Sequence, residues 1–189
     1  MFALSSGFIW DFKTGDNISF NLKIVEMLYA HYAAADDGEK QLLRKLIIVE
    51  LVSITEAMLY DFHERVQGSI REGVDGLATS VIDYIRRKTL EEFEKCIVSA
   101  RKHNLLGTRS QAIYNRLDEL RRLRNRVHIQ NSKGDFERDD SAAFSESRKE
   151  LAERVLEKVV RALSEKYPRP EHAVGHVADF SFPWAPYYV

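Results

Sequence analysis

The sequence predicts an all-α fold, an up-and-down bundle of four to five helices with an aromatic N-terminal arm and a proline-rich C-terminal extension. All four prolines lie after residue 167. Because proline inside a helix costs about 3 kcal/mol, the preceding chain is free to form long helices. That stretch is also rich in Leu, Ala, Glu, Lys and Arg, and strand-like alternation is scarce in it. We therefore expect the bundle over residues 17–167.

Length and composition fit one globular domain. The chain has 189 residues, of which 44% are hydrophobic and 30% charged, which excludes disordered, collagen-like and membrane-embedded classes. We divide it into a bundle over 1–167, with its arm at 1–16, and an extension at 168–189. The net charge is −1, so any role with nucleic acid must come from a local basic patch.

A few residue types indicate the cellular compartment of the protein and whether it binds a metal or a cofactor. Cys96 is the only cysteine, which excludes a disulfide within the chain and a Cys-rich zinc site, and favours a reducing, cytoplasmic location. The start lacks the basic region of an export signal, and acidic residues interrupt the apolar stretch 46–60, so we expect no membrane segment. His172 and His176 have helical ligand spacing, but no third ligand is evident. We expect no metal, and without a phosphate-binding glycine loop we expect no cofactor.

The first half of the bundle is expected to form two helices. Residues 1–16 are aromatic and predict an extended arm or short hairpin packed on the bundle. Asp16 or Asn17 is the expected N-cap of a first helix. After a turn at 36–38, the most apolar segment, 39–66, predicts a central second helix. The buried side of the first helix is expected to consist of Ile18, Leu22, Val25, Met27 and Leu28.

Glycines at 67–77 predict a loop before a third helical region at 78–104. Thr89 and Glu92 have the spacing of a capping box, so we expect a break near Lys88.

A fourth helix is expected at 110–129 and a polar loop at 130–140. Asp139 or Asp140 then caps a fifth helix that ends near Lys166. Its inner face is expected to consist of Leu151, Val155, Leu156, Val159 and Leu163. Beyond it, prolines and aromatic residues predict a non-helical tail that packs on this bundle or on a partner subunit. The tail aromatics are Tyr167, Phe180, Phe182, Trp184, Tyr187 and Tyr188.

The fourth helix carries the pattern that points to chemistry. Residues 101–130 contain eight basic and two acidic residues, a local charge of +6, which is typical of a surface that meets phosphates. At about 100° per residue, Arg121 and Arg124 lie within about 40° of His128, and Asn125 lies about 60° from it. Arg122 lies about 120° away.

This face combines a group that transfers protons near neutral pH with groups that hold phosphate oxygens. It suffices for metal-free cleavage of RNA, in which the substrate's own 2′-OH attacks the phosphate. The alternative interpretation of the arginines is a solvated helix face whose side-chain stems cover apolar surface. The alternative for His128, taken by itself, is a packed core histidine.

The order of these helices resembles the HEPN (higher eukaryotes and prokaryotes nucleotide-binding) domain superfamily over about residues 40–166. The family signature is an Arg, four to six residues, then His, often with a polar residue after the Arg. Five residues separate Arg122 from His128, and six separate Arg121 from it. Arg124 and Asn125 form the Arg–polar pair, but only three residues follow Arg124 before His128. The choice of motif arginine therefore stays open.

The resemblance implies a homodimer in which the two Arg/His helices meet across a cleft. Many members are metal-independent RNases, including toxins and other defence proteins, whereas others bind nucleotides or protein partners without catalysis. The resemblance also implies that an acid in the preceding apolar helix reaches the Arg/His helix. Glu56 is that acid, and it either pairs with Arg121 or Arg124 or faces solvent at a helix edge.

The sequence thus yields three hypotheses. The first is a ribonuclease in which Arg121 and Arg124, rather than Arg122, bind the scissile phosphate. In it, Asn125 orients the phosphate or His128, and His128 transfers protons. Its partners would be RNA or nucleotide, a second copy, and an antitoxin or nucleotidyltransferase. The second is a non-catalytic module that binds nucleotide or protein in the same cleft. The third is a structural bundle that assembles through its tail.

Overall fold

The computed structural model describes residues 1–69, 73–107, 111–127, 136–170 and 177–188. The prediction of an all-α bundle is confirmed, with one short two-stranded sheet added in the described part. The helices are α1 (Phe12–Ala34), α2 (Asp37–Gly68), α3 (Thr79–Arg86), α4 (Phe93–Lys102), α5 (Gln111–Arg124), α6 (Asp140–Ala143) and α7 (Glu146–Lys166). A 3₁₀ turn, η2 (Asn125–Val127), follows α5, and the strands are β1 (Phe2–Leu4) and β2 (Phe180–Phe182).

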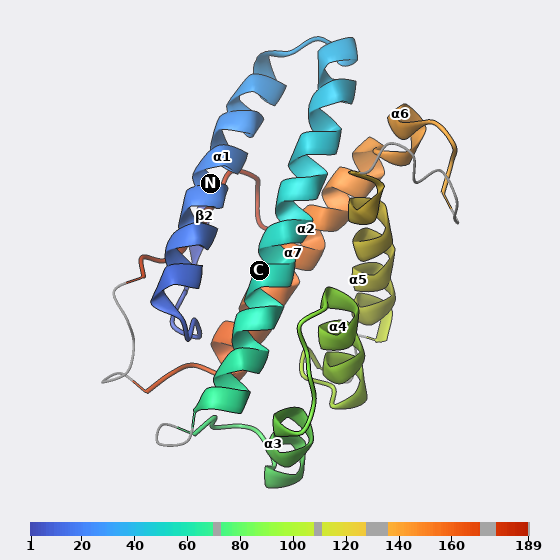
Figure 1. Cartoon of the computed structure of the whole chain (residues 1–189). Helices are drawn as coiled ribbons and strands as arrows, with labels where there is room; N and C mark the ends of the chain where they lie inside the picture. Colours follow the sequence, from blue (N-terminus) through green and yellow to red (C-terminus); the bar gives the residue numbers. More distant parts are fainter. Residues whose placement is uncertain (70–72, 108–110, 128–135, 171–176, 189) are drawn as a thin grey trace.

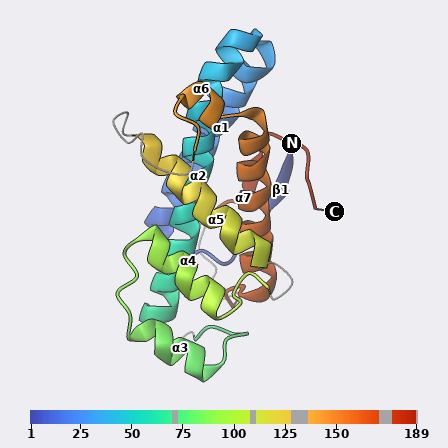
Figure 2. The same ribbon diagram turned by 90° about the vertical axis from the view of Figure 1, so that its right-hand side faces the viewer.

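Helix α2 occupies the centre of the bundle, as its apolar sequence predicts. It packs against α1, α3, α4, α5 and α7 (Figure 1). Helix α5 contacts both α2 and α7 and lies beside α4 (Figure 2). None of the helices in the described part combines the length and apolar character needed to cross a membrane.

Helix α1 begins before the predicted cap at Asp16 or Asn17. Asp11 is the N-cap, and its carboxylate accepts a hydrogen bond of 2.8 Å from the main-chain N–H of Thr14. Gly15 therefore lies inside the helix rather than in a turn. A Cβ there would lie 2.6 Å from a methyl carbon of Val177, so this glycine lets the C-terminal segment approach α1 closely.

Four of the five residues predicted for the inner face of α1 are buried. The prediction for Met27 is wrong, since its side chain is 54% exposed.

The turn before α2 is shorter than predicted. Asp36 caps α2 in a reciprocal capping box with Glu39, and Gly38 is already helical.

The break predicted near Lys88, within the third helical region, is confirmed and lies between α3 and α4, but its predicted cap is not. Helix α4 begins after Glu92, which makes no side-chain cap hydrogen bond, so the predicted capping box at Thr89 is wrong.

The predicted last helix is divided in two. Asp139 precedes α6, and the chain leaves helical geometry at Phe144, whose side chain is buried, before α7 begins.

The C-terminal tail packs on its own bundle. Strand β2 pairs antiparallel with β1, with Phe2 opposite Phe182 and Leu4 opposite Phe180. The main-chain N–H groups of Tyr187 and Tyr188 donate to the carboxylate of Glu157 on α7. Tyr167, Phe180, Phe182 and Trp184 are buried in this chain's own core.

Candidate functional site

An ion pair joins the central helix to the arginine-rich helix. Nη2 of Arg124 lies 2.7 Å from Oε2 of Glu56, and the two side chains are 34% and 25% exposed. This pairing becomes possible because α2 packs directly against α5. Glu56 thus pairs with Arg124, which is one of the two arginines expected as its partner.

Arg121 is held by carboxylates from two helices. Its Nη1 lies 3.1 Å from Oε2 of Glu94 on α4, and its Nε donates to Asp118 at 3.4 Å, one turn earlier on α5. The side chain is 18% exposed, so its guanidinium is fixed at the junction of α4 and α5 while one edge stays open to solvent.

Arg121, Arg124 and Asn125 line a single open cavity of about 390 Å³. The sequence places these three residues on one helix face, and they also share this cavity. Glu56 from α2 forms another part of its wall. The remaining lining comes from the start of α4 and the residues before it: Glu91, Glu92, Phe93 and Glu94.

These glutamates were not among the predicted site residues. They lie about thirty residues before Arg121 and carry no motif, and only the packing of α4 on α5 brings them to the arginines. The signal available in the sequence was the cluster of Glu91, Glu92 and Glu94 around the aromatic Phe93.

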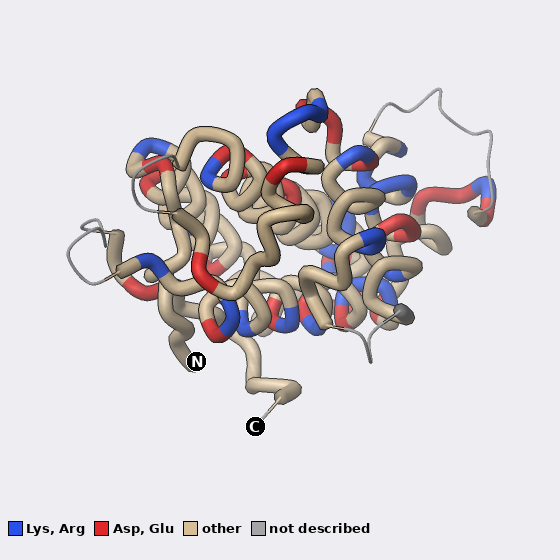
Figure 3. Tube along the Cα trace, turned by 90° about the horizontal axis from the view of Figure 1, so that it is seen from below, with Lys and Arg blue, Asp and Glu red and all other residues tan. Residues whose placement is uncertain are grey.

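The charge at this site is mixed, although the local sequence charge is +6. Arg101, a further member of the basic segment, also has an acidic partner, with its Nη2 3.0 Å from Oδ2 of Asp118. Basic and acidic positions alternate along the helices when the chain is seen from below (Figure 3). Counting charge along one segment overestimates the local potential, because acids from α2 and α4 face the same guanidiniums.

Two other arginines of the motif region point elsewhere. Arg122 is exposed outside the cavity lining, and its Nε donates to the main-chain oxygen of Asp118. Arg126 is buried, and its Nη2 donates at 2.9 Å both to the main-chain oxygen of Arg138 and to Oδ1 of Asp140. Its Nη1 also donates to the main-chain oxygen of Glu137. Arg126 therefore attaches the 137–140 segment to the end of α5.

His128, the predicted proton-transfer residue, lies outside the described residues, as do His172 and His176. The fourth helix was expected to stay α-helical to 129, but α5 ends at Arg124 and residues 125–127 form a 3₁₀ turn. The angular relation derived for His128 assumed α-helical geometry at these positions and therefore does not apply.

A second pocket of about 360 Å³ adjoins the arginine cavity and shares Glu56, Glu91 and Phe93 with it. Cys96 contributes to its wall. Burial raises the pKa of the Cys96 thiol to about 12, so the sulfur is protonated near neutral pH and is a poor nucleophile. Its Sγ donates to the main-chain oxygen of Leu90, and the side chain is buried in the core.

Comparisons with known proteins found no matching family model, curated protein or solved structure. Among the residues that the structure describes, no group of three His, Cys, Asp or Glu side chains is arranged to hold a metal ion.

Proposed function

We propose that this chain is a HEPN-like ribonuclease that cleaves RNA without a metal ion. The observation that carries the proposal is the Glu56–Arg124 ion pair, which lies beside Arg121 and Asn125 in one open cavity. A guanidinium held by a carboxylate in a half-buried site keeps a fixed orientation. A fixed donor can stabilise the charge that develops on a phosphate during cleavage.

In the proposed reaction, Arg124 and Arg121 donate hydrogen bonds to the non-bridging oxygens of the scissile phosphate. The 2′-oxygen of the RNA forms a bond to phosphorus as the bond from phosphorus to the 5′-oxygen breaks. The products are a 2′,3′-cyclic phosphate and a 5′-hydroxyl. His128 takes the proton from the 2′-OH or gives one to the departing 5′-oxygen.

Glu56 acts in this proposal as a positioning residue. In the free protein it neutralises Arg124, and a phosphate entering the cavity shares the guanidinium with it. Asn125 adds an amide donor at the same wall and orients the phosphate. Both arginine side chains are partly exposed and line the cavity, so a substrate phosphate can reach them there.

The wider setting is proposed from the resemblance. A second copy supplies the opposite Arg/His helix of a composite cleft. The ribonuclease acts in the cytoplasm as a toxin or another defence protein, with an antitoxin or a nucleotidyltransferase as its partner. These parts of the proposal are tested by the mass of the chain in solution and by its genomic neighbours.

The central test is cleavage of single-stranded and structured RNA in the presence of EDTA. His128→Ala, Arg124→Ala and Arg121→Ala are each expected to lower kcat/KM on the order of 100-fold or more. Arg116→Ala is the matched control, since Arg116 is an exposed arginine of α5 outside the cavity, and it should cleave like the parent. DNA of the same sequence should stay intact because it lacks the 2′-OH. Equal cleavage by parent and His128→Ala would remove the proposal.

The acidic lining favours a second candidate, a non-catalytic module that binds a nucleotide or a protein. Arg121 and Arg124 are each paired with a carboxylate, and a neutralised guanidinium attracts a polyanion less strongly. Under this alternative, nucleotide or RNA binds in an Arg124-dependent way and no product with a cyclic phosphate forms.

A further inference from the structure

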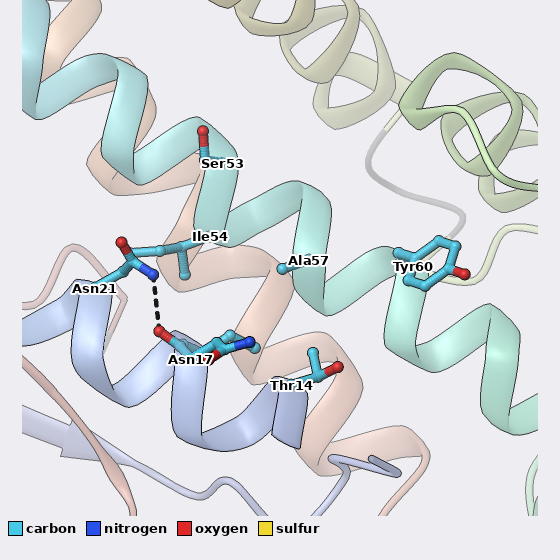
Figure 4. Close-up of a pocket in the computed structure, with 8 residues that line it drawn as sticks. Thr14, Asn17, Asn21, Ser53, Ile54, Ala57 and Tyr60 are labelled. Carbon is cyan, nitrogen blue, oxygen red and sulfur yellow. Dashed lines mark hydrogen bonds between the residues drawn. The ribbon is translucent and has the colours of Figure 1, made fainter. Parts of the chain in front are cut away.

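A pocket of about 260 Å³ lies between α1 and α2 (Figure 4). Its wall combines amide and hydroxyl groups with aliphatic side chains. The residues that matter for its chemistry are Asn17, Asn21, Ser53, Ile54, Ala57 and Tyr60. Asn21 and Tyr60 stand at opposite ends of the pocket, and the amide of Asn17 extends from α1 between them (Figure 4).

This pocket is connected to the arginine cavity. It shares Ser53, Ala57 and Tyr60 with the 360 Å³ pocket, which in turn adjoins the cavity through Glu56. The three pockets thus adjoin one another in a row from α5 to α1, and we refer to them together as the groove. Glu56 and Tyr60 are one helical turn apart, a rise of about 6 Å along α2.

We propose that this groove holds single-stranded RNA, with the base next to the scissile phosphate seated in the pocket between α1 and α2. The inference rests on the proposed function for the position of the phosphate, and it adds the substrate class and a base subsite.

Tyr60 provides the flat apolar surface that a base requires. Its side chain is half-buried at the junction of two of the pockets, so one ring surface can be covered by a ligand. Stacking of a base on an aromatic ring is tolerant of sequence, and removal of one such ring weakens binding by about 10-fold to 100-fold.

The two asparagines provide groups for the edge of a base. A carboxamide carries both a donor and an acceptor, which matches the mixed edges of nucleobases. Nδ2 of Asn21 donates to the main-chain oxygen of Asn17 at 2.8 Å, which fixes the orientation of this amide (Figure 4). Ile18 and Ile54 lie buried beneath, so the pocket offers an apolar floor with polar edges.

The charges of the lining differ between the two ends of the groove. Both arginines lie at the α5 end, where Glu56, Glu91, Glu92 and Glu94 also line the cavity, so this end has room for at most one phosphate between the arginines. The lining of the α1 end contains only uncharged residues, which suits a base. Glu56 and Glu91 line the middle pocket, between these two ends. Their negative charges disfavour a second phosphate there, but their carboxylates can accept hydrogen bonds from exocyclic amino groups of bases. A base can enter this pocket only when it is unpaired, which excludes a regular duplex.

The experiment measures binding of an uncleavable 2′-O-methyl RNA octamer of mixed sequence by fluorescence anisotropy at several salt concentrations. Tyr60→Leu is expected to raise Kd about 10-fold or more without changing the salt dependence, and Tyr60→Phe should bind like the parent. Arg124→Ala should instead lower the slope of log Kd against log salt by about 0.7 for each phosphate that the protein no longer neutralises. Phe20→Ala is the matched control, because Phe20 is an exposed aromatic of α1 outside the pocket. Asn21→Ala provides a second, conservative test of the pocket.

The outcomes separate this inference from the proposed catalysis. If no protein cleaves RNA but Tyr60→Leu still weakens binding of the octamer, the base subsite stands and the ribonuclease does not. If cleavage depends on His128 while Tyr60→Leu and Asn21→Ala bind and cleave like the parent, the subsite is overturned. The base subsite is also overturned if the parent does not bind the octamer or binds a duplex equally well. It is overturned as well if Tyr60→Leu changes only the mass of the protein in solution and not its affinity for the octamer.

Discussion

Glu56 and Arg124 form an ion pair of 2.7 Å between the central helix and the arginine-rich helix. The pair is partly exposed on both sides, so its net contribution to folding is about 0–1 kcal/mol. Its importance therefore lies in the position and charge of the guanidinium.

The first prediction concerns Glu56→Gln. We expect the free energy of unfolding to change by less than about 1 kcal/mol, because a partly exposed ion pair contributes little. Removing one negative charge beside Arg124 should tighten binding of the RNA octamer, whereas the less firmly held guanidinium should lower kcat of the proposed RNA cleavage. A fall in KM together with a fall in kcat would identify a positioning residue. Weaker binding at unchanged kcat would contradict this role.

Several features of this site could be predicted from the sequence. Helical spacing alone puts Arg121, Arg124 and Asn125 on one face, and the apolar run around Glu56 indicates a central helix. The wall formed by Glu91 and Glu94 could not be predicted, because it depends on how α4 packs on α5.

The fold shows the same division. The long apolar stretch within α2 indicates its central position, and Phe8 and Trp10 indicate a packed arm. The pairing of β1 with β2 joins residues about 180 positions apart, and no local propensity encodes such a contact. The role of Gly15 inside α1 could not be predicted for the same reason, since its lack of a side chain accommodates Val177 from the other end of the chain.

The second prediction is that Arg126 stabilises the fold, in contrast to an exposed arginine of α5. Arg126→Ala leaves acceptors at Glu137, Arg138 and Asp140 without their buried donor, so we expect a loss of about 2–3 kcal/mol in the free energy of unfolding. Arg116→Ala, on an exposed face of α5, should change it by less than about 0.5 kcal/mol. Urea denaturation of both variants makes the comparison. Similar midpoints for the two would show that Arg126 does not hold the 137–140 segment.

The third prediction tests the attachment of the C-terminal segment. Glu157 is fully buried and accepts hydrogen bonds from the main-chain N–H groups of Tyr187 and Tyr188 and from Nε of Arg161. Glu157→Ala removes all three, and we expect a loss of about 3 kcal/mol in the free energy of unfolding.

The matched control for this variant is Glu150→Ala on the same helix. Glu150 pairs with Arg154 at the same i, i+4 spacing, but both side chains are exposed, so a loss below about 0.5 kcal/mol is expected. Limited proteolysis should cut the Glu157→Ala protein near its C-terminus faster than the control. Equal cutting rates would mean that the tail stays attached without Glu157.

The fourth prediction is a pH dependence of stability that arises from His63. The ring is 1% exposed, and its Nδ1–H donates to the main-chain oxygen of Leu59 at 2.7 Å. Burial disfavours the charged ring and lowers its pKa from 6.5 to about 4. Folding therefore favours the neutral form. The stabilisation is present above pH 6.5 and is lost as the pH falls towards 4.

From these two pKa values, the parent should lose on the order of 2 kcal/mol between pH 8 and pH 5 through His63. Asp61 acts in the opposite direction, because burial raises the pKa of its carboxyl to about 6, so stability rises as the pH falls through that value. The informative quantity is therefore the difference between the parent and His63→Gln, in which Asp61 is unchanged. Denaturation with guanidinium chloride at pH 8, 6.5 and 5 should show that His63→Gln loses less free energy of unfolding than the parent as the pH falls. Parallel pH profiles for the two proteins would mean that His63 does not titrate with folding.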